Sequence, residues 1–389
     1  MKHAVEFLML FLFSMTLLTQ ATMAQESKPS RKFVAAIDRV MQQQGFRSDE
    51  PGAAILILQP GKLHFSKGYG QARLKDTTPI TPRTMFELAS ISKTFTSTAI
   101  LILQDRGRLS IQDDVRTLLP ELPVYHADNP IRIRDLLCHT SGLPEYFDIE
   151  DVPRRHKNYW VNADYLDVFS SRKTELKLSF PTGTRYEYCN TNYLLLAMII
   201  ERVSKKSYGQ FLRDEIFISA GMEHTFVNES PKSVPETHAK GCVRAIGYEW
   251  KKKREIWAPE WGVPPDRHEE LLIIGDGGIW TNLEDMSRWD VAVRSSQLLK
   301  PQTWKSALTP SRTRDGHPLD YGLGWMTYAD KNGEVYGYGH DGSWGGFRNS
   351  YYRHLTSDRT TVILSNRGSL DTDSLWDALN EVVEQHYGE

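Results

Sequence analysis

Ser90-Ile91-Ser92-Lys93 opens a stretch in which apolar residues recur at helical spacing and which ends at Gly107. This spacing predicts a helix with one buried face that begins within the motif. Side chains three positions apart lie on the same helix face, so the Lys93 amine can approach the Ser90 hydroxyl. A lysine shielded from water loses basicity and can then accept the serine proton. The pair indicates a serine nucleophile with its own base, although Ser-x-x-Lys alone is also typical of an ordinary capped helix.

A second polar stretch precedes another apolar helix, which the spacing predicts to begin at Tyr193. Tyr188 and Asn190 lie on the loop before this helix. Taken alone, Asn190 is interpreted as a helix cap and Tyr188 as a half-buried aromatic residue. Close to the Lys93 ammonium, however, Tyr188 can become a phenolate and share the work of general acid or base.

A third stretch, Gly339-His340-Asp341-Gly342-Ser343, lies at the end of a β-rich run. Its glycines allow a ligand to approach the strand closely, and the Ser343 N–H can face an oxyanion together with a second backbone N–H, that of the serine nucleophile.

Together with Gly337, this stretch also fits the dinucleotide pattern Gly-x-Gly-x-x-Gly. No helix pattern follows it, whereas a pyrophosphate site needs a helix N-terminus there. The match is therefore interpreted as misleading, and nucleotide binding is not expected.

Strand patterns lie near both ends of the chain, and helical patterns lie between them. The expected strands are Ala53–Gln59, Leu63–Tyr69, Tyr336–His340, Phe347–Arg353 and Thr360–Leu364, and helices are expected at Arg31–Gln44 and Leu375–His386. This order predicts an α+β fold in which one sheet is built from both termini, with an inserted, mostly helical sub-domain. We expect the sheet sub-domain to span about 31–110 and 270–389, and the helical sub-domain about 111–240.

Length and composition are those of an ordinary globular protein. The chain has 389 residues, a net charge of −2, 40% hydrophobic and 25% charged residues. These values exclude a disordered chain, a collagen and a coiled coil. A nearly neutral charge supplies no field that gathers polyanions, so nucleic acid is not the expected partner and a small molecule or short peptide is.

The first two dozen residues resemble a secretory signal. Lys2 is followed by the apolar run Phe7–Leu18 and by the small residues Ala21–Ala24. We expect residues 1–24 to be a cleaved signal peptide and 25–389 to form a periplasmic or secreted protein without a stable membrane span. An uncleaved anchor or a buried helix is the alternative, although the run is shorter than a spanning helix needs.

The three cysteines, Cys138, Cys189 and Cys242, are an odd number in a long chain, so disulfides are not expected to hold this fold together. Their spacing gives no metal site, and no His-Glu-x-x-His occurs. We expect neither a metal nor an organic cofactor.

The three motifs, in this order, resemble those of the serine β-lactamase and penicillin-binding-protein superfamily. The resemblance is strongest to the class C branch, which includes D,D-carboxypeptidases, D-aminopeptidases and related esterases. Three further stretches resemble the same family: Leu136–Pro144, Gly275–Trp280 and Tyr321–Trp325. The resemblance covers the chain from about Phe33 to the C-terminus. It implies a β-lactamase/transpeptidase-like fold with an antiparallel sheet flanked by helices.

The resemblance also implies roles for individual residues. It assigns catalytic roles to Ser90, Lys93 and Tyr188, and substrate-binding roles to Asn190, His340, Gly342 and Ser343. Ser90 is then the acylated nucleophile, with Lys93 and Tyr188 as the proton-transfer pair. The backbone N–H groups of Ser90 and Ser343 form the oxyanion hole.

The implied activity is two-step hydrolysis of an amide or ester through an acyl-enzyme. His340 stands where many true β-lactamases carry a lysine, which puts efficient β-lactam hydrolysis in doubt. A D-amino-acid peptide and a small carboxylic ester are rival substrates, and a β-lactam is third. A binder of penicillin or peptidoglycan without turnover is the alternative from another class. Nothing in the sequence predicts an oligomeric state.

Overall fold

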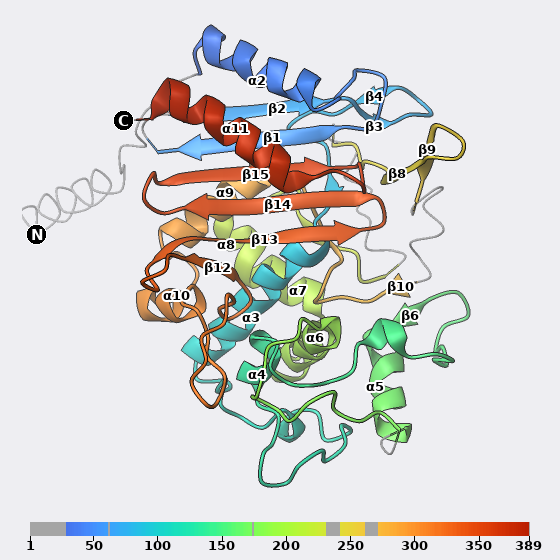
Figure 1. The fold of residues 1–389 in the computed structure, drawn as a ribbon. Helices are drawn as coiled ribbons and strands as arrows, with labels where there is room; N and C mark the ends of the chain where they lie inside the picture. Colours follow the sequence, from blue (N-terminus) through green and yellow to red (C-terminus); the bar gives the residue numbers. More distant parts are fainter. Residues whose placement is uncertain (1–28, 61–62, 173–174, 231–241, 261–270, 389) are drawn as a thin grey trace, which may run out of the picture.

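The computed structural model describes residues 29–60, 63–172, 175–230, 242–260 and 271–388. Its central feature is a six-stranded sheet with the order β12-β13-β14-β15-β1-β2, in which all neighbours are antiparallel (Figure 1). The strands are β1 (Ala53–Gln59), β2 (Leu63–Tyr69), β12 (Met326–Ala329), β13 (Val335–Trp344), β14 (Phe347–His354) and β15 (Arg359–Ser365). Because β1 pairs with β15, the sheet is built from both ends of the chain, and the predicted α+β fold is confirmed.

Strand β1 explains why the sheet is covered on both faces. All seven of its residues are buried, as are all seven of β15. Ala53, Ile55 and Ile57 point into one apolar cluster, whereas Ala54 and Leu56 point into the other. Alternate side chains of a strand point to opposite faces, so a run of apolar residues indicates two buried faces rather than one.

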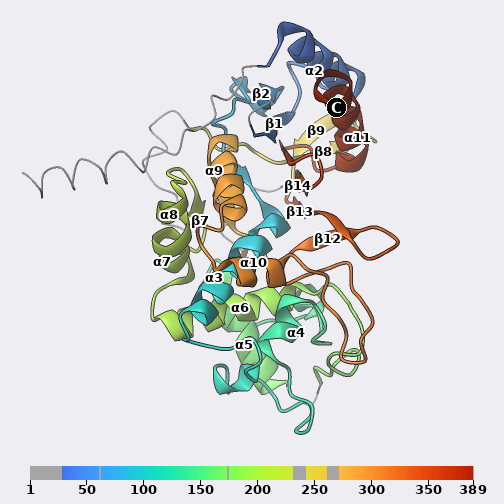
Figure 2. The same cartoon turned by 90° about the vertical axis from the view of Figure 1, so that its left-hand side faces the viewer.

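Helices cover each face of the sheet. Helices α2 (Arg31–Gln43) and α11 (Thr372–Tyr387) lie on one side, and α9 (Leu283–Arg294) lies on the other (Figure 2). The remaining α-helices are α3 (Ser92–Asp105), α4 (Ile133–Leu137), α5 (Asn162–Ser171), α6 (Asn190–Ser204), α7 (Tyr208–Leu212), α8 (Ile218–Ala220) and α10 (Pro301–Ala307). Helix α3 is buried along almost its whole length, and the Phe95 ring stacks on Trp289 of α9 at 4.0 Å.

The other strands are short and pair in separate sheets of two or three strands. They are β3 (Gln71–Arg73), β4 (Thr78–Pro79), β5 (Phe86–Glu87), β6 (Trp160–Val161), β7 (Phe226–Val227), β8 (Tyr248–Lys251), β9 (Ile256–Pro259), β10 (Leu271–Leu272) and β11 (Ile279–Thr281). The division of the chain into a sheet sub-domain and a helical sub-domain stays a prediction.

The structure corrects the predicted start of one helix and confirms that another begins within the first motif. Helix α6 begins at Asn190 rather than at Tyr193, and Cys189 rather than Asn190 is its N-cap residue. The polar residues at positions 190–192 broke the apolar pattern, but their side chains have hydrogen-bond partners of their own. Helix α3 begins at Ser92, after a 3₁₀ turn at Ala89–Ile91 that carries the serine of the first motif.

The predicted signal peptide, residues 1–24, lies outside the described residues. Among the residues that are described, no helix is both long and apolar enough to cross a membrane. Cys138, Cys189 and Cys242 are free and buried.

Asn366, which follows β15, joins segments that are far apart in the sequence. Its carboxamide oxygen accepts from the Gly52 N–H at 2.7 Å. Its Nδ2 donates to the carbonyls of Gln71, Ala72 and Ile246 at 2.9–3.2 Å. The side chain is fully buried, so water cannot replace these bonds.

Replacing Asn366 with Ala is expected to lower the free energy of unfolding by about 2–4 kcal/mol, because one N–H and several carbonyls lose a buried partner. The midpoint of urea denaturation measures the change. Asn332→Ala, at an exposed position between β12 and β13, is the control and is expected to shift stability by less than about 0.5 kcal/mol. Equal denaturation midpoints for the two variants would show that the buried hydrogen bonds of Asn366 do not stabilise the fold.

Candidate active site

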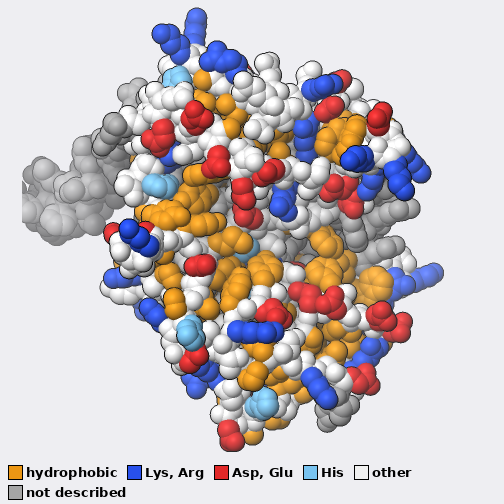
Figure 3. All heavy atoms as spheres, in the orientation of Figure 1, with side chains coloured by type: hydrophobic (Ala, Val, Ile, Leu, Met, Phe, Trp, Pro, Cys, Tyr) orange, Lys and Arg blue, Asp and Glu red, His pale blue; other side chains and the backbone are white. Residues whose placement is uncertain are grey.

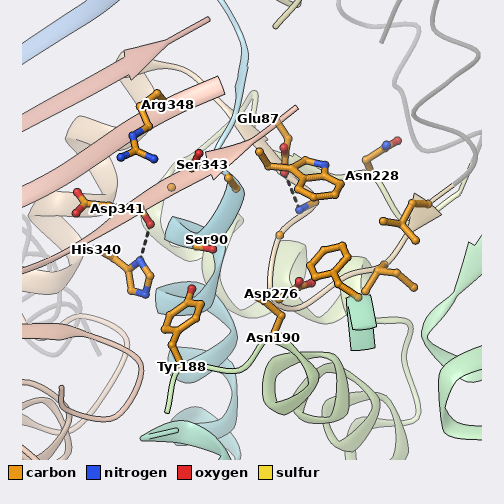
Figure 4. Close-up of a pocket in the computed structure, with 18 of the residues that line it drawn as sticks. Glu87, Ser90, Tyr188, Asn190, Asn228, Asp276, His340, Asp341, Ser343 and Arg348 are labelled. Carbon is orange, nitrogen blue, oxygen red and sulfur yellow. Dashed lines mark hydrogen bonds between the residues drawn. The ribbon is translucent and has the colours of Figure 1, made fainter. Parts of the chain in front are cut away.

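Ser90 lies on the wall of a pocket with a volume of about 340 Å³ (Figure 4). Six of the seven residues implied by the resemblance line it: Ser90, Tyr188, Asn190, His340, Gly342 and Ser343. The seventh, Lys93, is fully buried behind Ser90. The structure therefore brings together residues that span 250 positions of the sequence.

Lys93 is held by three acceptors. Its ammonium donates to Ser90 Oγ at 3.0 Å, to Asn190 Oδ1 at 2.8 Å and to the Asp276 carbonyl at 2.9 Å. The Tyr188 ring lies 5.0 Å from the same nitrogen. An ammonium has three N–H donors, so this geometry satisfies all of them and fixes the nitrogen next to the serine oxygen.

Asn190 reaches Lys93 because of its place at the first turn of α6. Its Nδ2 donates to Glu145 Oε2 at 3.0 Å, and its backbone N–H donates to the same oxygen at 2.7 Å. These bonds orient the amide so that its oxygen faces Lys93. Burial raises the pKa of the Glu145 carboxyl, although the Asn190 N–H groups act against this effect.

Asp276 is held in place by Tyr146, which also lines the pocket. Its Oδ2 accepts from the Tyr146 hydroxyl at 3.0 Å, and its carbonyl accepts from Lys93. Burial raises the pKa of the Asp276 carboxyl, and the positive charge of Lys93 lowers it. Sequence reasoning did not select Glu145, Tyr146 or Asp276. Their closeness in the sequence to family-like stretches could have indicated them. Glu145 directly follows the stretch Leu136–Pro144, and Asp276 lies within Gly275–Trp280.

His340 is buried beside Tyr188 and is held at both ring nitrogens. Nδ1 lies 2.6 Å from the Asp341 carbonyl, and Nε2 lies 2.9 Å from the Tyr321 hydroxyl. A carbonyl only accepts, so Nδ1 carries the hydrogen and Nε2 accepts from Tyr321. Burial and the charge of Lys93 lower the pKa of His340 to about 3. The ring is therefore neutral near pH 7 and supplies no positive charge to a substrate.

Gly342 allows β13 to lie against the turn that carries Ser90. A Cβ atom at this position would come within 2.2 Å of the Leu88 carbonyl oxygen, so no larger residue fits without backbone movement. This close approach brings Ser343 to the same pocket as Ser90. The proposed pair of oxyanion N–H donors stays a prediction. β13 continues as a strand to Trp344, so no helix follows the glycines, as a dinucleotide site would need.

The loop that carries Tyr188 is supported by His139. The Cys189 N–H donates to His139 Nδ1 at 3.1 Å, and the Glu187 N–H donates to the His139 carbonyl. The His139 and Tyr188 rings are stacked with their centroids 4.4 Å apart. Burial lowers the pKa of His139 well below its usual value, so the ring is neutral. These contacts make His139 a structural support of the loop.

Comparison with known proteins fits this geometry. The model of the Beta-lactamase family matches residues 37–384. The chain belongs to the beta-lactamase family. It is 31% identical to penicillin-binding protein 4* of Bacillus subtilis (strain 168) over 324 residues, which are 80% of this chain and 67% of that protein.

Solved structures share the beta-lactamase-family fold. A penicillin-binding protein from Bacillus halodurans gives a TM-score of 0.71 at 24% identity, over 90% of this chain and 98% of that one. The D-amino acid amidase from Ochrobactrum anthropi SV3 gives a TM-score of 0.70 at 21% identity, over 91% and 99%. Membership of this family makes the chain a serine hydrolase.

Glu87 is a further carboxylate that sequence reasoning missed. It lines the pocket at 5% exposure, and its Oε1 accepts from the Gly278 N–H at 2.9 Å. Its Oε2 has no hydrogen-bond partner among the described residues. Burial raises the pKa of Glu87 to about 7. Because this pKa is raised in the folded state, the folded protein keeps a proton that the unfolded chain loses, and stability falls as pH rises from about 4.5 to 7.

Glu87→Gln removes this titration and is expected to stabilise the protein relative to wild type by up to about 3 kcal/mol more at pH 8 than at pH 5. Urea denaturation of both proteins at the two pH values measures the difference. Glu334→Gln, at an exposed position, is the control and should leave the pH dependence unchanged. An unchanged pH dependence in Glu87→Gln would show that this carboxyl does not titrate in the window.

Proposed function

We propose that the protein is an exported serine hydrolase that cleaves an amide or ester bond through an acyl-enzyme on Ser90. The observation that carries this proposal is the 3.0 Å hydrogen bond between Lys93 Nζ and Ser90 Oγ inside a shared pocket. The order of the three motifs and the family membership support it.

In the proposed mechanism, Ser90 Oγ attacks the carbonyl carbon and its proton passes to the deprotonated oxygen of Tyr188. The Lys93 ammonium already carries three hydrogens, and its charge stabilises that oxygen. The backbone N–H groups of Ser90 and Ser343 bind the oxyanion. Tyr188 then gives the proton to the leaving amine or alcohol, and the acyl group stays on Ser90. A water molecule attacks the acyl carbonyl in the second step, and its proton passes through the same Tyr188 oxygen to Ser90 Oγ.

The charges around the pocket favour a substrate without a carboxylate next to the scissile bond. His340 is neutral, and the carboxyl groups of Glu87, Asp276 and Asp341 line the pocket together with one arginine, Arg348. An anionic substrate would meet these carboxyl groups without a compensating cation from His340. An amide or ester is therefore preferred to a β-lactam, whose carboxylate needs such a cation. The likeness to a D-amino acid amidase supports an amide.

The pocket walls are suited to an apolar group on the substrate. The Phe147 ring lies 5.2 Å from the Trp344 ring, and Phe147 also stacks on Tyr146 at 4.2 Å. All three rings line the pocket beside Ser90. Aromatic walls with a small number of placed polar groups are typical of small-molecule sites.

A fluorophosphonate probe is expected to add one adduct mass to the wild-type protein and none to Ser90→Ala. Hydrolysis of p-nitrophenyl esters should fall at least about 10³-fold in Ser90→Ala, because the acyl-enzyme can no longer form. Intact-mass spectrometry and a rate assay measure the two effects. Full hydrolysis by Ser90→Ala would overturn the assignment of the nucleophile. An unlabelled but folded wild type would favour a binder without turnover.

Tyr188→Phe is expected to lower kcat by about 10²–10⁴-fold with little change in folding, because the phenol hydroxyl takes part in proton transfer. Tyr186→Phe is the matched control, since it removes the same hydroxyl from an exposed position two residues away. Steady-state kinetics on one ester and circular dichroism of both variants provide the comparison. A similar kcat for the two variants would remove Tyr188 from the mechanism.

A further inference from the structure

A second pocket, of about 320 Å³, lies beside the active site on the side of the sheet that carries α11. Strands β12, β13 and β14 form its floor, and α11 forms one wall. Figure 3 shows orange side chains next to a group of red ones on this face, where β13, β14 and α11 lie in Figure 1. The motif analysis did not point to this pocket, and the proposed mechanism does not use it.

A glycine on β13 lets one of the aromatic rings of this pocket lie against the sheet. Asp341 pairs with Ser350 and Gly339 pairs with Tyr352, so Gly337 and Gly339 share a face of β13 with Asp341. A Cβ atom on Gly337 would come within 2.6 Å of Tyr352 Oη. The absence of a side chain at Gly337 therefore leaves the place that the Tyr352 ring occupies.

Four aromatic rings form the walls: Tyr328, Tyr336, Tyr352 and Trp376. The Tyr352 ring is perpendicular to Trp376 at 4.9 Å and lies 5.0 Å from Tyr328. Tyr336 is 40% exposed at the rim. Aromatic faces carry partial negative charge and attract cations, most strongly organic ammonium groups.

Three carboxylates also line the pocket: Asp341, Asp373 and Asp377. Ser350 and His354 are its remaining lining residues, and burial lowers the pKa of His354. None of the three carboxylates forms an ion pair with a lysine or arginine in the part of the chain that the structure describes. Asp341 is the most buried, and its burial and the charge of Asp373 raise its pKa. The charge of Arg348, on the active-site side, acts in the opposite direction on Asp341. A cation in the pocket would relieve the repulsion between Asp341 and Asp373.

Asp341 lines this pocket and the active-site pocket alike, so the two pockets adjoin at this residue. Ser343 follows two residues later on the same strand. A strand rises about 3.3 Å per residue, which puts Asp341 about 7 Å and Gly339 about 13 Å from Ser343 along β13. A substrate of ordinary length can therefore place its carbonyl at Ser90 and another group in this second pocket.

We propose that the pocket formed by the four rings and three carboxylates is a subsite for an organic ammonium group of the substrate. This proposal rests on the proposed function and narrows its substrate class to amides or esters that carry a cation about 7–13 Å from the scissile carbonyl. Ring faces and carboxylates together select a cation over a neutral group of the same shape, and they reject an anion.

The kinetic test uses esters that carry a trimethylammonium group five to ten bonds from the carbonyl carbon, either in the acid part or in the alcohol part. Each ester is compared with its uncharged tert-butyl isostere. In one of the two series we expect the charged ester to have a KM about tenfold lower than its isostere. Asp377→Asn is expected to reduce this ratio to about threefold or less.

Glu381→Gln is the matched control, because it removes the same charge from an exposed position one turn further along α11, outside the pocket. It should keep the tenfold ratio of KM values. Trp376→Leu removes a ring instead of a charge and should also reduce the ratio. A similar loss in Glu381→Gln would mean that the preference comes from the general charge of the surface, and this would overturn the subsite.

A binding measurement separates the subsite from the proposed function. Tetramethylammonium chloride is titrated by calorimetry into Ser90→Ala and into the same protein with Asp377→Asn, with sodium chloride as the salt control. Saturable binding that Asp377→Asn weakens supports the pocket even if no ester is hydrolysed, and that absence of hydrolysis would count against the proposed function alone. Equal KM values for charged and neutral esters in both series would overturn the substrate subsite, with or without binding of the free ion. No binding beyond that of sodium chloride would overturn the pocket itself.

Discussion

A fully buried ammonium group, that of Lys93, sets the conditions for the rest of the site. An unpaired charge in a protein interior is strongly destabilising, so Lys93 needs an acceptor for each of its N–H groups. The three acceptors come from three separate segments: the turn before α3, the first residue of α6 and the loop before β11. The chain can bury Lys93 only when these segments have already come together.

Two of these three acceptors are held by a further residue. Glu145 binds both nitrogens of Asn190, and Tyr146, the next residue, binds the Asp276 carboxylate. Neighbouring residues on one loop thus orient two acceptors of the same ammonium. The sheet supplies the remaining wall, because Gly342 lets β13 lie against the turn that carries Ser90. The Ser-x-x-Lys pattern is a weak signal in the sequence alone. These contacts in the folded structure distinguish this pair from a chance occurrence of the pattern.

The sequence predicted the features that depend on local pattern. The strands of β1 and β15 and the helices α2 and α11 follow from apolar spacing, and the three motifs identified the residues that now line one pocket. The α6 start was placed late because polar side chains inside the first turn find partners on distant loops. Glu87, Glu145 and Asp276 were missed for the same reason, since their importance comes from burial and from contacts across the fold. The aromatic pocket was also missed, because its rings come from β12, β13, β14 and α11 and show no common pattern in the sequence.

The environment of His340 shows why a motif alone does not define a substrate. A histidine at the surface of a sheet could be protonated and bind a carboxylate. Here the Asp341 carbonyl fixes the hydrogen on Nδ1, Tyr321 occupies Nε2, and Lys93 repels a second positive charge. Burial of the ring and the charge of Lys93 together therefore keep His340 neutral. The histidine of the third motif therefore offers no positive charge to a substrate, and this follows from its surroundings rather than from the motif itself.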